Sequence, residues 1–489
     1  MKIQELNPQG VWNNFYSLTQ IPRPSGKKKE ISDFLASYGR SLGLETVQDE
    51  IGNVIIRKPA SKGYEGHAGV ILQGHMDMVP QKNSDIEFDF SKDPIRAYVD
   101  GEWVTAEGTT LGADNGIGVA TAMAILADNT IEHPQLEAFF TVDEETGMYG
   151  AFDLKGGVLQ GKTLINLDSE TEGELYVGCA GGVDSNIEFD FFSQPMPEGD
   201  KALRITLKGC KGGHSGCDIN LQRANAIKLL FRFLKEAVSE YEARLAFVCG
   251  GSLRNSIPRE AEAVITVPAE GAEDIMQLTE DFEDLFVREY DGVEDNLQLI
   301  CEEYSKSDLP VMPEEIQDSL INAVIACPDG VARMIPEMPD VVETSNNLAI
   351  IQTVLPENEK QPTIVKICCL TRSSVESRKE ELQNQIESVF ALAGAKIEFE
   401  GSYPGWKPNL NSRILDIMQE TYKEEFNQEP RIITIHAGLE CGIIGRNYPG
   451  MDMISFGPTI KHPHSPDEKV NIATVEKFWQ FLLATLKKL

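Results

Sequence analysis

Several features that would assign the chain to a particular class are missing from it. No run of about 18 apolar residues occurs in its 489 residues, so no segment is expected to span a membrane. The opening stretch, MKIQELNPQGVWNNF, lacks the basic and then apolar segments of a secretory signal, and the cytosol is the expected location. Low-complexity tracts are absent too. With 41% hydrophobic residues, the composition indicates a soluble globular protein.

Basic residues are few relative to acidic ones. The chain has 44 Lys and Arg against 77 Asp and Glu, a formal net charge of -33. Nucleic acids and anionic membranes would be repelled by such a protein, so neither is an expected partner. The acidity is compatible with a protein that collects cations.

The nine cysteines include no CxxC pair, are odd in number and are irregularly spaced. This pattern favours reduced thiols over a disulfide framework or a cysteine zinc site. The adjacent Cys368 and Cys369 are most simply explained as the two faces of one strand.

The chain is too long for one ordinary core, so at least two domains are expected. Up to residue 184, apolar runs such as NVIIRK, GVILQG and LEAFFTV alternate with helical patterns, which predicts an α/β domain whose mostly parallel sheet is covered on both faces. Residues 185–399 have more alternating strands and two strand-and-helix passes, typical of an inserted α+β domain. Residues 400–489 resume the first pattern and are expected to complete the first domain.

Five stretches carry side chains of the kind that bind metals, mostly where a predicted strand ends or a helix starts. They contain His75 with Asp77 (VILQGHMDMVP), Asp114 with Asn115 (GADNGIG), Asp143 to Glu145 (TVDEETG), Asp168 (INLDSE), and His462 with His464 (IKHPHSPDEKV). In an open α/β sheet the loops at the carboxyl ends of the strands converge on one crevice, so these groups are expected to meet there.

Each of these stretches is a weak signal alone. A single histidine is more often structural, an aspartate at a helix start is first an N-cap, and paired glutamates after a strand are usually solvated. Together, however, carboxylates packed against apolar strands would cost free energy unless a positive charge neutralised them. Few Lys or Arg residues are near them in the sequence, so a divalent cation is favoured. Imidazole and carboxylate ligands without thiolate suit zinc, with cobalt or manganese as substitutes. Five or six ligands favour two metals about 3.5 Å apart that share a carboxylate.

The segments HMDMVP, GADNGIG, DEETG, NLDSE, GGHSG, RNSIP and HSPDE resemble, in order and spacing, the cocatalytic zinc peptidases that include carboxypeptidase G and the bacterial dipeptidases. The resemblance covers essentially the whole chain. It implies a zinc-peptidase-like catalytic domain (residues 1–184 and 400–489) with an inserted lid (residues 185–399). It also implies hydrolysis of unblocked dipeptides, including Xaa-His, with a small peptide as the substrate.

The resemblance further implies a role for each matching residue of the first domain. Two Zn²⁺ per subunit would be held by His75 and Asp168 on one side, by Glu145 and His464 on the other, and by Asp114 as the bridge. Asp77 would orient His75, and Glu144 would be the general base that takes a proton from a zinc-activated water. The peptide bond from Asp114 to Asn115 would be cis.

Substrate contacts are implied mainly for the lid. His214 in GGHSG would help to hold the oxyanion, Asn255 in RNSIP would contact the substrate, and Arg372 would grip its free carboxylate, although a surface strand arginine is an alternative for Arg372. Substrate-pocket positions are also implied in IHAGLECG, at His436, Gly438 and Glu440.

Several alternatives stay open. Many relatives outside the dipeptidase branch have a lysine at the position of Asn115, so the asparagine favours that branch. The family pattern prefers His464 over His462 as the ligand, but spacing alone does not separate them, and His67 and His133 are expected to be structural or exposed. An aminoacylase, a tripeptidase, a carboxypeptidase or a catalytically dead peptide- or metal-binding relative remains an alternative function. A homodimer is a possible assembly.

Overall fold

The structure is a computed structural model that describes residues 1–305, 309–358 and 360–489. Contacts between residues divide the chain into two compact units. The first contains Met1–Cys179, Trp406–Thr434 and Leu439–Leu489, and the second contains Ala180–Gly405 and Ile435–Gly438. No helix in the described ranges is long and apolar enough to cross a membrane.

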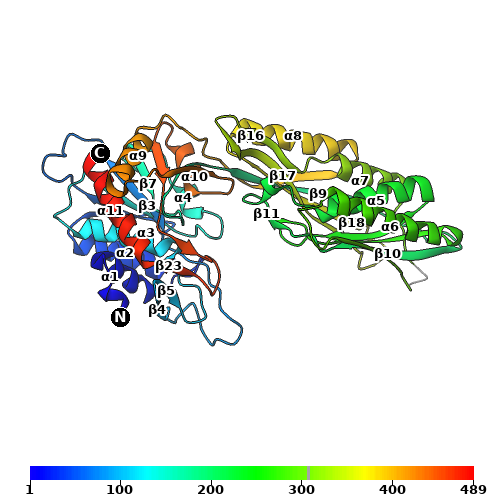
Figure 1. The fold of residues 1–489 in the computed structure, drawn as a ribbon, viewed down its shortest axis with the longest axis horizontal. Helices are drawn as coiled ribbons and strands as arrows, with labels where there is room; N and C mark the ends of the chain where they lie inside the picture. Colours follow the sequence, from blue (N-terminus) through cyan, green and yellow to red (C-terminus); the bar gives the residue numbers. More distant parts are fainter. Residues whose placement is uncertain (306–308, 359) are drawn as a thin grey trace. The chain divides into compact units, whose positions relative to one another are not determined.

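The first unit is built on an eight-stranded sheet (Figure 1). From edge to edge its strands are β1 (Glu45–Gln48), β2 (Val54–Lys58), β6 (Leu136–Thr141), β3 (Val70–His75), β7 (Thr163–Asn166), β21 (Asp452–Ser455), β8 (Glu174–Cys179) and β20 (Arg431–Ile435). The four central strands β6, β3, β7 and β21 run parallel, whereas β1, β2 and β8 pair antiparallel with their neighbours. The expected α/β fold with a mostly parallel centre is confirmed.

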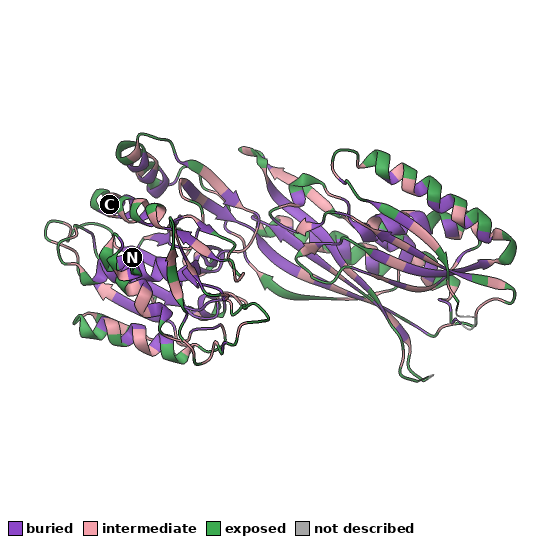
Figure 2. Ribbon diagram, turned by 60° about the horizontal axis from the view of Figure 1, so that its bottom comes forward, coloured by how far each residue is buried: buried purple, intermediate pink, exposed green. Residues whose placement is uncertain are grey.

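Burial explains why the centre of this sheet is so apolar. Every residue of β3 and of β6 is buried, as expected for parallel strands covered on both faces. Figure 2 shows purple, the colour of buried residues, concentrated in the interior of the unit. α2 packs on β1 and β2, α3 on β3 and β6, α9 on β21 and α10 on β8. The helices of the unit are α1 (Gln9–Thr19), α2 (Lys29–Ser41), α3 (Ala113–Ala127), α4 (Tyr149–Asp153), α9 (Arg413–Phe426), α10 (Glu440–Asn447) and α11 (Ile472–Lys488), with the short 3₁₀ turn η1 (Ile3–Glu5).

A small second sheet lies in the same unit and joins distant parts of the sequence. Its strands, in order, are β22 (Ile460–Lys461), β23 (Lys469–Asn471), β5 (Trp103–Ala106) and β4 (Ala97–Asp100). The pairing of β23 with β5 fastens the C-terminal HSPDE segment next to the residues that precede α3.

The second unit contains a nine-stranded sheet whose strand pairs are antiparallel. The strands, in order, are β15 (Gln298–Glu303), β10 (Asp200–Lys208), β14 (Ala261–Pro268), β12 (Arg244–Gly250), β17 (Met338–Val354), β18 (Thr363–Ser373), β9 (Gly181–Phe191) and β19 (Lys396–Tyr403), with β16 (Gly330–Ile335) paired to β17. The helices are α5 (Ala226–Tyr241), α6 (Ala272–Glu289), α7 (Glu314–Ala326) and α8 (Glu376–Leu392), with the 3₁₀ turns η2 (Ile219–Leu221) and η3 (Ala269–Gly271). A two-stranded ribbon pairs β11 (Gly213–His214) with β13 (Ser256–Ile257).

The unit boundaries differ from the expected ones at residues 184/185 and 399/400. The second sheet already begins at Gly181, where β9 pairs with Ser373 of β18, and it continues to Tyr403 in β19. The chain also returns to the second unit for Ile435–Gly438, a short excursion that local patterns do not indicate.

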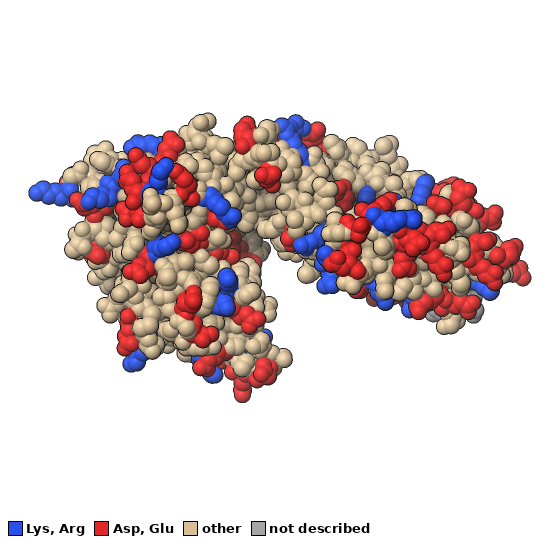
Figure 3. Space-filling view, viewed as in Figure 1, with Lys and Arg blue, Asp and Glu red and all other residues tan. Residues whose placement is uncertain are grey.

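The acidic excess is visible on both units. Figure 3 shows Asp and Glu side chains gathered densely on the visible face of the second unit, with Lys and Arg scattered between them.

Candidate metal centre

The candidate ligands of the first unit follow neighbouring strands of its parallel sheet. His75 is the last residue of β3, Asp143 to Glu145 follow β6, and Asp168 follows β7. Since these strands lie side by side and run parallel, their carboxyl ends open onto one edge of the sheet. Asp114 stands at the start of α3 and completes the group.

His75 lies against two of the expected carboxylates. Its Nε2 is 3.0 Å from Asp114 Oδ1 and 3.2 Å from Asp168 Oδ1. The side chains of all three are largely buried. Although burial opposes it, the carboxylates around the imidazole raise the pKa of His75 well above its ordinary value.

Asp114 offers its second oxygen to the other half of the site. Its Oδ2 is 3.1 Å from His464 Nε2, which is also 2.9 Å from Glu145 Oε2. One carboxylate therefore has one oxygen toward His75 and the other toward His464, which is the arrangement that a bridging ligand requires. The peptide bond between Asp114 and Asn115 is cis, as the motif resemblance implies.

The donor set fits a pair of divalent cations. Three groups have ligand atoms within 4.8 Å of one another: His75 with Asp114 and Asp168, His75 with Glu144 and Glu145, and Asp114 with Glu145 and His464. Burial raises the pKa of Asp168 to about 6 and raises that of Glu144 well above its ordinary range. Carboxylates so far out of water need positive charge in order to remain ionised, and oxygen and imidazole nitrogen are suitable ligands for zinc.

Asp77 connects His75 to the loop that carries Glu144. The Nδ1 of His75 is 3.2 Å from the main-chain oxygen of Asp77 and 3.5 Å from its Oδ1. The Asp77 carboxylate also accepts the Glu144 backbone N–H at 3.1 Å and the Ser25 hydroxyl at 2.6 Å. Asp77 therefore acts on the orientation of both His75 and the loop that carries Glu144.

The family model described as Peptidase family M20/M25/M40 matches residues 71–488. The chain belongs to peptidase family M20/M25/M40. Metallopeptidases of this family use a site for two metals, and the grouped carboxylates and imidazoles are the candidate ligands in this chain. The membership inferred from the motifs is confirmed.

Relatives within this peptidase family match the chain over its full length. The cytosol non-specific dipeptidase of Escherichia coli (strain K12) is 44% identical over 490 residues, covering 100% of this chain and 99% of the relative. The aminoacylhistidine dipeptidase structure from Vibrio alginolyticus is 46% identical, with a TM-score of 0.92 over 100% of this chain and 98% of that one. A tripeptidase from Staphylococcus aureus is 18% identical, with a TM-score of 0.56 over 99% of this chain and 98% of that one, and it shares the fold.

Two buried side chains that hold the ligand loops in this M20 chain were not among the predicted residues. Glu468 accepts the backbone N–H groups of Leu111, Gly112, Ala113 and Asp114 at 2.7 to 3.2 Å. Arg23 donates to the carbonyl oxygens of Met76, Asp77 and Gly112. Glu468 closes the HSPDE motif and could have been singled out there, whereas no local signal distinguishes Arg23.

Asn115 packs between two of the ligand-bearing strands. Its Nδ2 donates to the Leu167 carbonyl at 2.6 Å, next to Asp168. Its Oδ1 lies so close to Gly74 that a Cβ at that position would collide with it. The glycine before His75 is therefore needed because the cis-linked Asn115 approaches β3 there.

Glu440, which the resemblance implies as a substrate-pocket position, bonds to the strands of the central sheet. It is fully buried at the start of α10 and accepts hydrogen bonds from Gln73 at 2.5 Å and Thr141 at 2.7 Å. Burial raises the pKa of its carboxyl group to about 7. Glu440 thus supports β3 and β6 through Oε2, whereas its Oε1 is buried without a hydrogen-bond partner.

The expected substrate residues of the second unit lie on connected elements. His214 pairs with Ser256, next to the exposed Asn255. The buried Arg372 donates from Nη1 to the Tyr403 hydroxyl at 2.9 Å, which removes the alternative of a surface arginine.

His436 is held through Nε2 by the Ser345 hydroxyl at 2.7 Å. Burial, and then the charges of Arg372 and His214, lower the pKa of His436 to about 3, so its imidazole stays neutral. Gly438 ends the short return segment.

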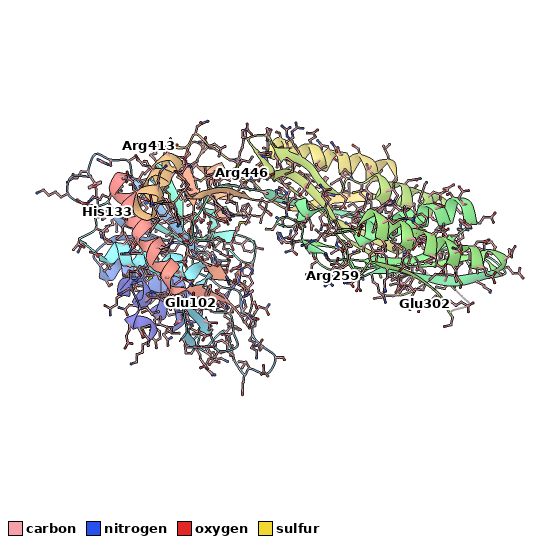
Figure 4. The ribbon with its side chains drawn as sticks, viewed as in Figure 1. Glu102, His133, Arg259, Glu302, Arg413 and Arg446 are labelled. Atoms are coloured by element: carbon pink, nitrogen blue, oxygen red, sulfur yellow. The ribbon has the colours of Figure 1, made fainter. Side chains whose placement is uncertain are left out.

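The remaining histidines of the first unit lie outside the candidate metal groups found among the described residues. The Nδ1 of His67 is 2.8 Å from the Leu489 main-chain oxygen. His133, which Figure 4 labels in the first unit, is buried with Nδ1 2.7 Å from the Pro134 carbonyl. Among the described residues, His462 belongs to none of the candidate metal groups. These positions agree with the structural roles expected for His67 and His133.

The choice between the two C-terminal histidines can be tested by metal content. We expect His464→Ala to lose one of two metals, because its Nε2 is the atom that faces both Asp114 and Glu145. His462→Ala, two residues away, is the matched control and should keep both. Metal analysis after dialysis measures the difference, and loss of metal from the His462 variant alone would show that His462 is the ligand.

Proposed function

We propose that the chain is a dizinc dipeptidase that hydrolyses unblocked dipeptides, including those with a C-terminal histidine. The observation that carries the proposal is the placement of Asp114, with one oxygen toward each histidine, beside the buried Glu144. The full-length relatives named cytosol non-specific dipeptidase and aminoacylhistidine dipeptidase support the substrate class.

His75 and Asp168 would hold one Zn²⁺, Glu145 and His464 the other, and Asp114 both. Zinc at this position supplies Lewis acidity, which polarises a carbonyl and makes water a nucleophile at neutral pH. Cobalt or manganese would suit the same oxygen and nitrogen donors.

The proton transfers are assigned to Glu144. Its carboxylate takes a proton from the attacking water and then delivers that proton to the leaving amine, so that no proton is lost to solvent between the two steps. The loop that carries Glu144 is fixed through its backbone N–H to Asp77, which limits the positions that the base can adopt.

Substrate recognition is assigned to the second unit. His214 would donate to the developing oxyanion, and its pKa is lowered, first by burial and then by Arg372, so that it is mainly neutral. Asn255 would contact the peptide, and Arg372 would pair with the terminal carboxylate in the bidentate geometry that a guanidinium allows.

The rival functions are an aminoacylase, a tripeptidase or a carboxypeptidase of the same family. The tripeptidase neighbour is too distant in sequence to indicate a substrate, since at 18% identity it shares the fold alone. A pure binding protein would not need an acid/base carboxylate such as Glu144 beside the ligands.

A substrate panel with metal removal tests the proposal. The chelated protein should be inactive, and Zn²⁺ should restore hydrolysis of unblocked dipeptides, including an Xaa-His dipeptide, but not of N-acetyl amino acids or tripeptides. Ninhydrin or chromatographic detection of the released amino acids measures each reaction. Faster cleavage of the N-acetyl substrates, or full activity after complete metal removal, would contradict the assignment.

A further inference from the structure

The middle of β17 is a run of buried polar residues. Five consecutive polar side chains, Glu343 to Asn347 in ETSNN, are all buried, with 1% exposure at each of the last three. Burying polar groups is costly unless they are hydrogen-bonded, so their partners indicate what the segment does.

Asn347 reaches across to the loop that carries Asn255. Its Nδ2 donates to the Ser256 carbonyl at 2.9 Å and lies 3.4 Å from the Arg254 carbonyl, so one amide holds the main chain on both sides of Asn255. The loop leaves β12 at Gly251, where a Cβ would collide with the Ala349 carbonyl of β17. The hydrogen bonds of Asn347 therefore hold this loop to β17, and Gly251 allows the loop to approach the strand closely.

The same loop is joined to the strand of His214. Ser256 pairs with His214, and the Ser215 N–H donates to the Asn255 carbonyl at 2.8 Å. Fixing the loop through Asn347 therefore also fixes the backbone on which His214 stands.

The face of β17 that carries Asn347 also serves another of the expected substrate residues. Ser345 is two residues earlier and points to the same face, because side chains of a strand alternate. Its hydroxyl holds His436 at 2.7 Å, and its backbone is in register with Arg372.

Asn347 is less well satisfied than a purely structural residue would be. Its Oδ1 is buried without a hydrogen-bond partner, whereas the neighbouring Asn346 uses both amide atoms, accepting from Thr371 and donating to Pro328. An unpaired buried oxygen is unfavourable for stability, so stability alone does not explain an amide at position 347.

We propose that Asn347 is a positioning residue for substrate binding: it holds the Asn255 loop, and through it His214, in the geometry that the peptide requires. The proposal rests on the dipeptidase function proposed for the chain. Asn347 itself acts through the loop and not on the reacting atoms.

A double-mutant cycle tests this role. Asn347→Ala should lower kcat/KM for a dipeptide by about tenfold to a hundredfold, the scale of a misplacement of about 1 Å. In an Asn255→Ala background the same change should have a smaller further effect, because the contribution of the Asn255 side chain is already removed and only the route through His214 remains. Asn346→Ala, equally buried on the opposite face, is the matched control and should leave kcat/KM within about threefold of wild type, as stability alone does not alter catalysis by the folded fraction.

Hydrogen exchange supplies a readout that does not depend on activity. The amides of Ser215 and Ser256 should exchange faster in Asn347→Ala than in Asn346→Ala, since both belong to the fastened loop and ribbon. Any of three results would overturn the proposal. Asn347→Ala could lower kcat/KM equally in both backgrounds, Asn346→Ala could lower kcat/KM as much as Asn347→Ala does, or exchange at these amides could be unchanged. A wild-type chain that cleaves no dipeptide would refute the proposed function, and hydrogen exchange alone would then decide the role of Asn347.

Discussion

Replacing Glu144 with glutamine should abolish measurable turnover while both metals and the fold remain. General-base catalysis contributes about 10²- to 10⁴-fold, and Glu144 is proposed to serve two proton transfers, so the loss in kcat should reach the upper part of that range. Glutamine has nearly the same volume and keeps an oxygen, but it does not accept a proton at neutral pH. Dipeptide kinetics, metal analysis and circular dichroism on the same preparation measure the three expectations.

The environment of Glu144 makes this substitution informative. Burial raises the pKa of its carboxyl group well above the ordinary range, and the neighbouring carboxylates add to the effect, while His75 opposes it. A neutral glutamine should therefore be tolerated in the fold. The loss of activity would then report on the missing proton acceptor and not on a collapsed loop.

Glu170→Gln is the matched control for the Glu144 variant. Burial raises the pKa of Glu170 to about 9, and the charges of Asp114 and Asp168 reinforce the shift, but Glu170 is in none of the candidate metal groups found among the described residues. This variant should keep at least about a tenth of wild-type activity, as expected for a carboxylate outside the catalytic groups. Near-normal turnover in Glu144→Gln, or an equal loss in both variants, would remove the general-base assignment.

The candidate metal centre was predictable because most of its candidate ligands follow a local signal. Buried strands that end in His75 or run up to Asp168 are visible as apolar runs, and parallel strands bring their carboxyl ends to one edge. The helix start at Asp114 is equally local. From the sequence, however, only the motif resemblance separates His464 from His462, because the two histidines are two residues apart in one loop.

Features that depend on contacts between residues far apart in the chain were harder to predict from the sequence. Arg23 is conspicuous only when the carbonyls of Met76, Asp77 and Gly112 have been brought around it by the fold. The return of Ile435–Gly438 to the second unit has no compositional mark, because its membership is decided by contacts such as the one between His436 and Ser345. Long-range hydrogen bonds of this kind leave no periodicity in the sequence.

The second large effect is expected for Asp114→Asn, which should lose both metals and nearly all activity. Among the residues that the structure describes, Asp114 is the one carboxylate with an oxygen toward both His75 and His464, so the neutral amide should weaken both halves of the site together. Changes to partners outside the ligand shell already cost about 10- to 100-fold in metal affinity, so the loss of a shared ligand should cost at least that factor at each position. Metal content after equilibrium dialysis against a graded zinc buffer measures the two affinities.

Asp143→Asn is the matched control for the bridging aspartate. Its carboxylate lies in the adjacent loop and accepts from the Gly26 N–H at 2.7 Å and from Lys28 at 3.0 Å, but it belongs to no ligand group. Both metals should stay bound in this variant. Loss of a single metal from Asp114→Asn would show that Asp114 holds one ion only, which would contradict the proposal that two cations share this carboxylate. Because Glu468 holds the backbone of residues 111–114 through four N–H groups, the loop should keep its place in Asp114→Asn, so metal loss would trace to the missing charge.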